Sequence, residues 1–248
     1  MSNILDKLVR DFSFTAENQT SFIFPSPVGL VPVITTLDVT SDAAAVVSLS
    51  LGGTQALLNV DCTNPHSDVT FRSLRGGDSG AGLNIIYTDP SANDVPLAVA
   101  VTINTTPATG GFDIDIDVTL STSGAGAIIA TAQEIIDFVN ADETFRLYAE
   151  AYKSASNNGT GVVEAKVSAP LAGQAETLKW REETEAAAIL HKAWAPGGMK
   201  GIYAGDDVKV DVSAGTDIEI NVSGFWIPGS PQSPRFGEIT PAEELIFA

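Results

Sequence analysis

Cysteine is almost absent from this 248-residue sequence, in which Cys62 is the only one. A single thiol can form neither an intrachain disulfide nor a thiolate metal cage, so a disulfide-stapled secreted module is excluded. Histidine is nearly as scarce, since His66 and His191 are the only two and lie far apart in sequence. They could bind zinc only with carboxylate ligands beside them, so we interpret both as ordinary surface or half-buried side chains.

Basic residues are also few. The chain has 13 Lys and Arg against 31 Asp and Glu, which gives a formal net charge of −18. A surface this negative repels the phosphates of nucleic acids and anionic membranes. We therefore expect no direct binding to nucleic acid and no membrane attachment.

Long apolar runs are missing as well. No segment approaches the roughly 18 consecutive apolar residues of a membrane span, and the first residues are too charged for a secretory signal. The sequence contains no P-loop, no Gly-x-Gly-x-x-Gly after a strand and no Cys-x-x-Cys. We expect no cofactor and no enzymatic activity.

What the sequence does contain is a strong β pattern. Residues 208–212 and 218–225 alternate apolar with polar side chains, which is typical of strands with one buried face. Residues 33–39 and 45–49 are β-branched runs, and Gly52-Gly53 then predicts a hairpin turn. Further strands are expected at 55–60, 189–194 and 199–203.

The middle of the sequence predicts a compact α+β unit with one helix. Thr131 and Glu134 form a capping box, and the helix behind it is expected to end near Asn140. Its apolar positions fall at helical spacing: Ala132, Ile135, Ile136 and Val139. The strands expected around it are 69–71, 83–87, 97–103, 112–120, 145–151 and 162–167.

The charge-dense segment 174–185, QAETLKWREETE, has two interpretations. It is either a short helix or a linker that leaves the middle unit, and helix propensity favours the helix.

Two parts of the sequence resemble a known family. SDVTFRSLRGGDSGAGLNIIYTDPSANDVPLAVAV, DIDVTLSTSGAGAIIATAQEIIDFVNAD and SASNNGTGVVEAKVSAPLAG resemble a module of tailed-bacteriophage virion proteins. The flanking segments TTLDVTSDAAAVVSLSLGGTQALLNV and GGMKGIYAGDDVKVDVSAGTDIEINVSGFW resemble together a small β-sandwich of head-decoration proteins. The resemblance carries over no active-site residue.

The resemblance implies a mainly β protein in which a β-sandwich formed by both chain ends carries an inserted small α+β module. The expected parts are an arm at 1–32, a sandwich from 33–66 with 174–225, an inserted module at 67–173, and a tail at 226–248. An insertion of this kind is feasible where its two ends meet in a surface loop.

The implied function is non-enzymatic: a capsid decoration or cementing protein, located in the virion and bound to the major capsid protein or other virion subunits. A homo-oligomer is expected, and a trimer would suit a local three-fold position. The alternatives are a tail-tube or fibre component and a carbohydrate-binding cell-surface module. The expected contact residues are aromatic: Phe12, Phe14, Phe22, Phe24, Trp226, Phe236 and Phe247.

Three motifs admit a chemical interpretation. Gly77-Asp78-Ser79-Gly80 matches the nucleophile motif of trypsin-like proteases, but neither histidine has the required spacing, so a Gly-rich turn is favoured. Asp113, Asp115 and Asp117 share one face of a strand and are weak candidates for a Ca²⁺ site, although a solvated strand face explains them. Three tryptophans could stack on sugars, but core or interface anchors are favoured: Trp180, Trp194 and Trp226.

Overall fold

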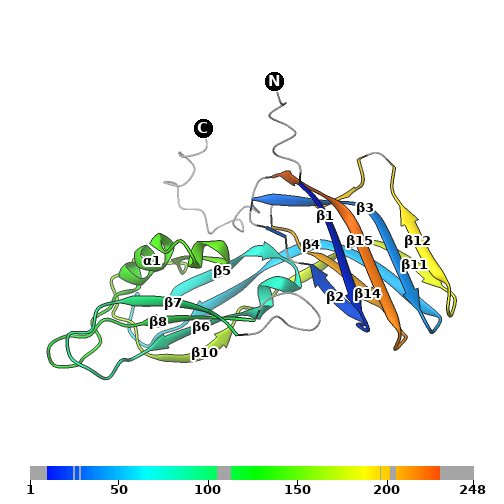
Figure 1. Ribbon diagram of the computed structural model, residues 1–248. Coiled ribbons are helices and arrows are strands. Elements are labelled where there is room, and N and C mark those ends of the chain that lie inside the picture. The colour runs from blue at the N-terminus through cyan, green and yellow to red at the C-terminus, as the bar shows by residue number, and fades with distance from the viewer. Residues whose placement is uncertain are drawn as a thin grey trace.

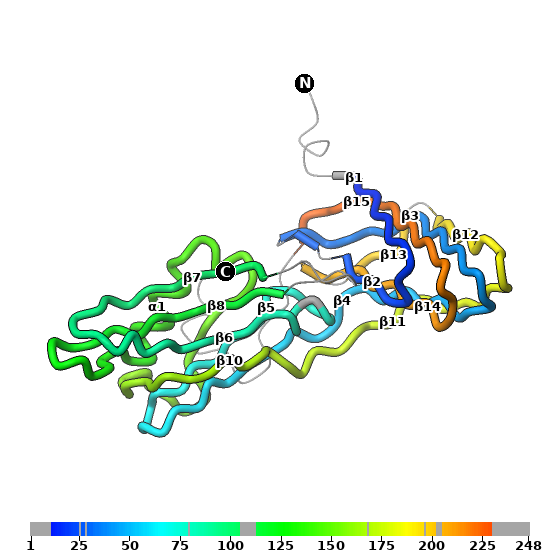
Figure 2. The backbone as a smooth tube through the Cα atoms, turned by 60° about the horizontal axis from the view of Figure 1, so that its bottom comes forward, coloured from blue at the N-terminus to red at the C-terminus, as the bar shows by residue number. Residues whose placement is uncertain are grey.

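The computed structural model describes residues 10–24, 26–27, 29–104, 113–195, 197–201 and 205–229. Over these residues the protein is mainly β with a single α-helix, which confirms the expected fold class. The strands form two lobes that are joined by one long strand, β4 (Ala45–Val60) (Figures 1 and 2).

One lobe contains two sheets built from both ends of the sequence. In the first sheet, the strand order is β1 (Arg10–Glu17), β15 (Ile218–Pro228), β3 (Leu30–Ser41) and β12 (Ile189–Ala193), with β13 (Met199–Lys200) also paired to β3. In the second sheet, β2 (Ser21–Phe24) pairs with β14 (Val208–Val212), β14 pairs with β4, and β4 pairs with β11 (Ala175–Thr184).

Both sheets of this lobe contribute to one hydrophobic core. Alternate residues of β3 and β15 are buried together with alternate residues of β4 and β14, as the period-two pattern requires. The sandwich interpretation is compatible with this shared core, although its proposed boundaries stay predictions. We refer to this part as the sandwich lobe.

The other lobe, which we call the helical lobe, has its own core. The second half of β4 pairs with β5 (Val69–Gly76), and β5 pairs with β9 (Ala149–Lys153). A separate sheet has the order β10 (Lys166–Pro170), β6 (Leu83–Thr88), β8 (Ile114–Thr119), β7 (Ala98–Ile103), in which β6 and β8 are parallel. The helix α1 (Ala132–Ala141) adds its apolar face to this core, and two short 3-10 helices, η2 (Asp78–Gly82) and η3 (Phe145–Leu147), connect strands.

The predicted helix and its capping box are confirmed. Thr131 is the N-cap, its hydroxyl oxygen accepts a hydrogen bond from the Glu134 amide at 3.3 Å, and the Glu134 carboxylate accepts one from the Thr131 amide at 2.8 Å. The four apolar positions expected to face the core are all buried: Ala132, Ile135, Ile136 and Val139. Within the described residues no helix has the length and apolar character needed to cross a bilayer.

The hairpin predicted at Gly52-Gly53 is wrong. The strand continues through both glycines without a turn, so β4 belongs to both lobes. Gly52 has φ +59°, and a Cβ atom on Gly53 would lie 1.6 Å from the carbonyl oxygen of Ala175. The glycines are needed because the strand bends here against a neighbouring backbone, which is a close approach rather than a turn.

The helix predicted over 174–185 is also wrong, since this segment is the strand β11. Its residues pair with β4 from Ala45 to Thr54, and long-range pairing outweighs the local helix preference of Glu, Lys and Leu. Smaller differences occur elsewhere. The first residues of the predicted strand 145–151 form η3, and the predicted strand 162–167 begins four residues later, as β10.

The N-terminal residues predicted as an arm contain two strands in the described part. β1 pairs with β15 along its whole length, and β2 pairs with β14. Trp226, expected in the tail, lies within β15. The other predicted domain boundaries stay predictions.

Candidate interaction surfaces and polar clusters

Five of the aromatic residues expected to contact a partner gather at one edge of the sandwich lobe. The rings of Phe12 and Trp226 are 4.3 Å apart, those of Phe14 and Phe24 are 4.7 Å apart, and Phe22 follows at 4.6 Å from Phe24. Phe24 and Trp226 are buried, and the other three are half-buried. Much of this aromatic area is therefore used inside the chain, and its proposed contact with another subunit stays a prediction. Phe236 and Phe247 lie outside the described residues.

Large apolar side chains are exposed elsewhere, on both lobes. In the sandwich lobe they are Leu178 on β11, 57% exposed, and Ile189 on β12, 71% exposed. In the helical lobe they are Ile103, Ile129, Phe138, Leu147 and Val167. Single exposed apolar residues are common on proteins, so the backbone around each of them decides whether it marks a contact surface.

Leu178 is placed on the surface by an irregularity in β11. The pairing of β11 with β4 shifts register on both sides of this residue, between Glu176 and Leu178 and again between Leu178 and Trp180. Such bulges redirect a side chain relative to its neighbours on the strand. Leu178 lies beside a shallow hollow of about 470 Å³ on the second sheet, lined by Thr20, Ser21, Val46, Ser48, Leu178, Arg181, Asp211, Val212 and Ser213.

A partly buried polar cluster lies where the two lobes meet. The Glu176 carboxylate accepts a hydrogen bond from the amide of Asp78 at 2.6 Å, and the Asp78 carboxylate pairs with Lys209 Nζ at 2.6 Å. Asp207 is fully buried beside Gly77. These residues come from β11, η2, β14 and the segment before β14, so the cluster joins four parts of the chain.

Burial and neighbouring negative charges shift the pKa values of residues in and beside this cluster. Desolvation, with Asp207 and Asp78 nearby, raises the pKa of Glu176 to about 8. Desolvation also lowers the pKa of Arg75 to about 10, and that side chain donates to the carbonyl oxygens of Ser26 and Leu147, both at 3.0 Å. The guanidinium also lies 5.4 Å from the ring centre of Tyr148. The polar groups of this cluster therefore make their described contacts with backbone and side-chain atoms of the protein itself.

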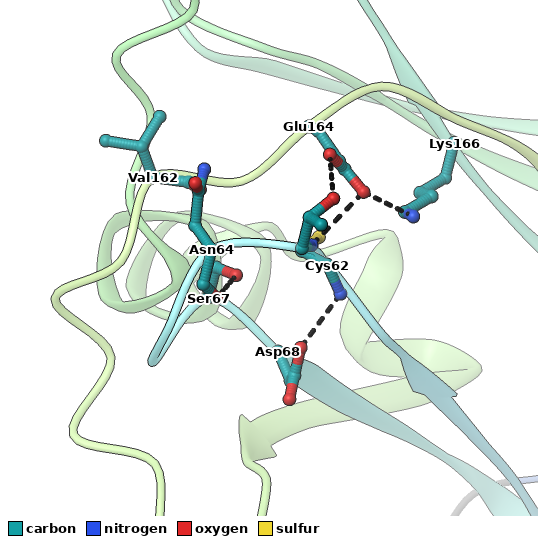
Figure 3. Close-up of polar contacts among 8 residues, drawn as sticks. Cys62, Asn64, Ser67, Asp68, Val162, Glu164 and Lys166 are labelled. Atoms are coloured by element: carbon teal, nitrogen blue, oxygen red, sulfur yellow. Dashed lines mark hydrogen bonds and ion pairs between the residues drawn. The ribbon is translucent and has the colours of Figure 1, made fainter.

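A second polar cluster fixes the loop after β4, as Figure 3 shows. The amide of Cys62 donates to Asp68 at 2.8 Å, and the Asn64 side chain donates to the carbonyl oxygen of Val162 at 2.8 Å. Glu164 pairs with Lys166 at 2.6 Å and accepts from the Thr63 hydroxyl at the same distance. Burial raises the pKa of the Cys62 thiol, so the thiolate needed for nucleophilic attack is disfavoured. The contacts give the cluster a structural role.

The protease-like motif Gly77–Gly80 overlaps the start of η2, and Gly77 is its N-cap. Asp78 is engaged with Glu176 and Lys209, and His191 pairs with Asp38 on the first sheet of the sandwich lobe. The contacts described for this motif include neither histidine.

The three aspartates lie along β8 and its preceding residue, as their alternation predicted. Asp115 accepts hydrogen bonds from Asn84 at 3.1 Å and from Asn104 at 2.8 Å, so amide donors surround it. No group of acidic, histidine or cysteine side chains suited to a metal ion occurs among the residues with described positions.

The tryptophans have separate surroundings. Trp180 and Trp194 meet edge to face with ring centres 6.0 Å apart, and Lys192 Nζ lies 5.3 Å from the centre of Trp180. Trp226 packs on Phe12. The lining of the hollow beside Leu178 includes none of them.

The sequence predicts neither the polar cluster between the two lobes nor the exposure of Leu178. Asp206 and Asp207 look like turn residues after Gly205, and their burial depends on contacts with distant glycines. The sequence predicts a strand at the uncharged run AVAVTI of β7, but its position at the edge of a sheet follows only from the topology.

Comparison of the chain with protein-family models, with curated proteins and with solved structures found no match.

Proposed function

We propose that the protein is a non-enzymatic structural component of a larger protein assembly, most specifically a capsid decoration protein of a tailed phage. The observation that carries this proposal is the exposed Leu178, which a double register shift places beside a hollow on the sandwich lobe. A β-strand that gives up regular pairing to expose leucine has lost ladder hydrogen bonds without gaining core, which suits a residue selected for contact with another subunit.

The chemistry of the hollow fits a protein surface. Val46 and Leu178 supply apolar area, while Arg181 and Asp211 supply polar contacts beside it. An apolar centre with a polar surround is the usual composition of protein interfaces. Each Å² of apolar area removed from water contributes roughly 25 cal/mol before ordering costs.

The proposed partner is the major capsid protein or another virion subunit, and the proposed location is the virion. The net charge of −18 suits a protein that covers the outside of a particle in many copies, because like-charged surfaces keep particles apart. A homo-oligomer remains part of this proposal.

The test is attachment of the purified chain to phage particles from its own source that have been stripped of it. We expect Leu178→Asp to lower the apparent affinity at least tenfold, since one buried leucine contributes about 1.5–3 kcal/mol. Ile189→Asp is the matched control. It adds the same charge to a residue of the same lobe that is even more exposed, on the other sheet, and should leave attachment unchanged.

Cryo-electron microscopy of the intact particles separates the alternatives. Density for the chain on the capsid supports decoration, whereas density only in the tail favours a tube or fibre component. Absence from every particle would overturn the virion proposal. Glycan binding that is lost when Trp180 is changed would then favour the carbohydrate-binding alternative.

A further inference from the structure

The outer strand of the helical lobe, β7, has an open edge. In the part of the chain that the structure describes, β7 ends its sheet and pairs only with β8. Its sequence, AVAVTI, has no charged residue and no proline, and its register with β8 is regular throughout. An open strand edge presents unpaired N–H and C=O groups and is a template for another strand.

The other outer strands are protected by the usual devices. β12 carries Lys192, β9 carries Glu150 and Lys153, and β1 carries Asp11 and Glu17. β10 contains Pro170 and a register shift, β11 carries several charges, and β2 is only four residues long. Among these strands β7 alone combines six residues with regular geometry and no charge, so its edge is suited to pairing.

The hydrogen-bond register identifies which groups of β7 point outward. The amide of Asn104 donates to the carbonyl oxygen of Asp113 at 2.9 Å, on the β8 side. Because bonding direction alternates along an antiparallel pair, residues 98, 100 and 102 also bond to β8. The N–H and C=O groups of Val99, Val101 and Ile103 therefore point away from the sheet.

We propose that β7 pairs antiparallel with β7 of a second copy of the chain, about a two-fold axis at Val101. Val101 then faces Val101 of the other copy, and Val99 faces Ile103. Each of these three outward residues exchanges two backbone hydrogen bonds with its opposite residue. The pairing also covers Ile103, which is 60% exposed in the single chain, with Val99 of the other copy.

A second copy suits this edge because the residues that would face one another, Val99, Val101 and Ile103, are all apolar, and the net charge of each copy gives the interaction a distinctive salt dependence. The carboxylates of the neighbouring strand, Asp115 and Asp117 on β8 and Asp113 just before it, lie one strand further in. In the pair they would be separated by three strand spacings, roughly 14 Å, which exceeds the Debye length of about 8 Å at physiological ionic strength. The uncharged edge can therefore pair despite the net charge, and added salt should strengthen the pair. A basic partner would show the opposite dependence.

The helix α1 contacts β7 and lies over it in Figure 1. The inference goes beyond the proposed function, because the pairing edge lies in the helical lobe and Leu178 lies in the sandwich lobe. Failure of either test leaves the other standing.

The experiment is sedimentation velocity of the full chain over a range of concentrations, at low and at high salt. We expect a monomer–dimer equilibrium that shifts toward dimer as salt rises. Ile103→Pro removes one outward N–H per copy without touching the bonds to β8, and should weaken the dimer about tenfold. Ile103→Thr keeps the N–H and should dimerise more strongly than the proline variant.

Amide hydrogen exchange supplies a second readout that needs no variant. The amides of Val99, Val101 and Ile103 should gain protection as concentration rises, while those of Ala98 and Ala100 stay protected throughout. A monomer at every concentration, a trimer, or protection that does not change with concentration would each overturn the proposal.

Discussion

Glu176 is the side chain in which burial and charge conflict most clearly. Its pKa is raised to about 8 because desolvation and the neighbouring Asp207 and Asp78 disfavour the charged form. An acid whose pKa is higher in the folded state binds more protons when folded. Its contribution to stability is therefore fully present below the unfolded pKa, 4.5, and is lost as pH rises through about 8.

Replacing Glu176 with Gln should remove this pH dependence. The amide oxygen can still accept from Asp78, and no charge needs to be desolvated. We expect the melting temperature of Glu176→Gln to exceed that of the wild type by about 2–4 °C at about pH 9 and to match it at about pH 5. Thermal denaturation across this range tests it, with Glu183→Gln, on the exposed face of the same strand, as control. An equal shift at every pH would contradict the assignment.

At the scale of elements, the strand β4 depends on glycines that have no room for a side chain. A Cβ atom on Gly53 would meet the carbonyl oxygen of Ala175 at 1.6 Å, whereas one on Gly173 would have no atom within 4 Å. Gly173 has φ +81°, so alanine there carries only a backbone penalty.

Alanine at Gly53 should accordingly destabilise the protein more than alanine at Gly173. We expect losses of about 2–3 kcal/mol for Gly53→Ala, from forced displacement of β11, and about 1 kcal/mol for Gly173→Ala. Urea denaturation measures both. Equal losses would mean that β11 moves aside freely.

The elements found from sequence are those with local signals. The capping box and apolar spacing of α1 lie within eleven residues. The alternation of apolar and polar residues in β14 and β15 is visible in each segment by itself. The elements missed depend on distant contacts. Gly52-Gly53 indicates a turn locally, and only the approach of Ala175 and Asp206 explains why the strand continues. The proximity of Glu176 and Asp207 could not be predicted from the sequence for the same reason.

At the scale of the molecule, β4 couples two cores. Leu49 and Leu51 lie in the core of the sandwich lobe, and Ala56 and Val60 lie in that of the helical lobe. Unfolding of either core would disrupt β4 and thereby disturb the other core, so we expect the lobes to unfold in one transition.

The tryptophans allow a direct test, because Trp180, Trp194 and Trp226 all lie in the sandwich lobe. Ile116→Ala in the helical lobe should cost about 2–5 kcal/mol and lower the midpoint seen by tryptophan fluorescence. Leu49→Ala is the reference variant in the sandwich lobe. A tryptophan transition unaffected by Ile116→Ala would show that the lobes unfold independently.

The pairing of β1 with β15 has a consequence for the order in which the protein is made. Residues 10–17 meet residues 219–226, so a growing chain holds its first strands without partners until nearly all of the described sequence has been translated. The helical lobe, whose core residues fall between 56 and 171, can condense earlier. During this delay the first strands lack their partners, which leaves their backbone edges open to other nascent chains.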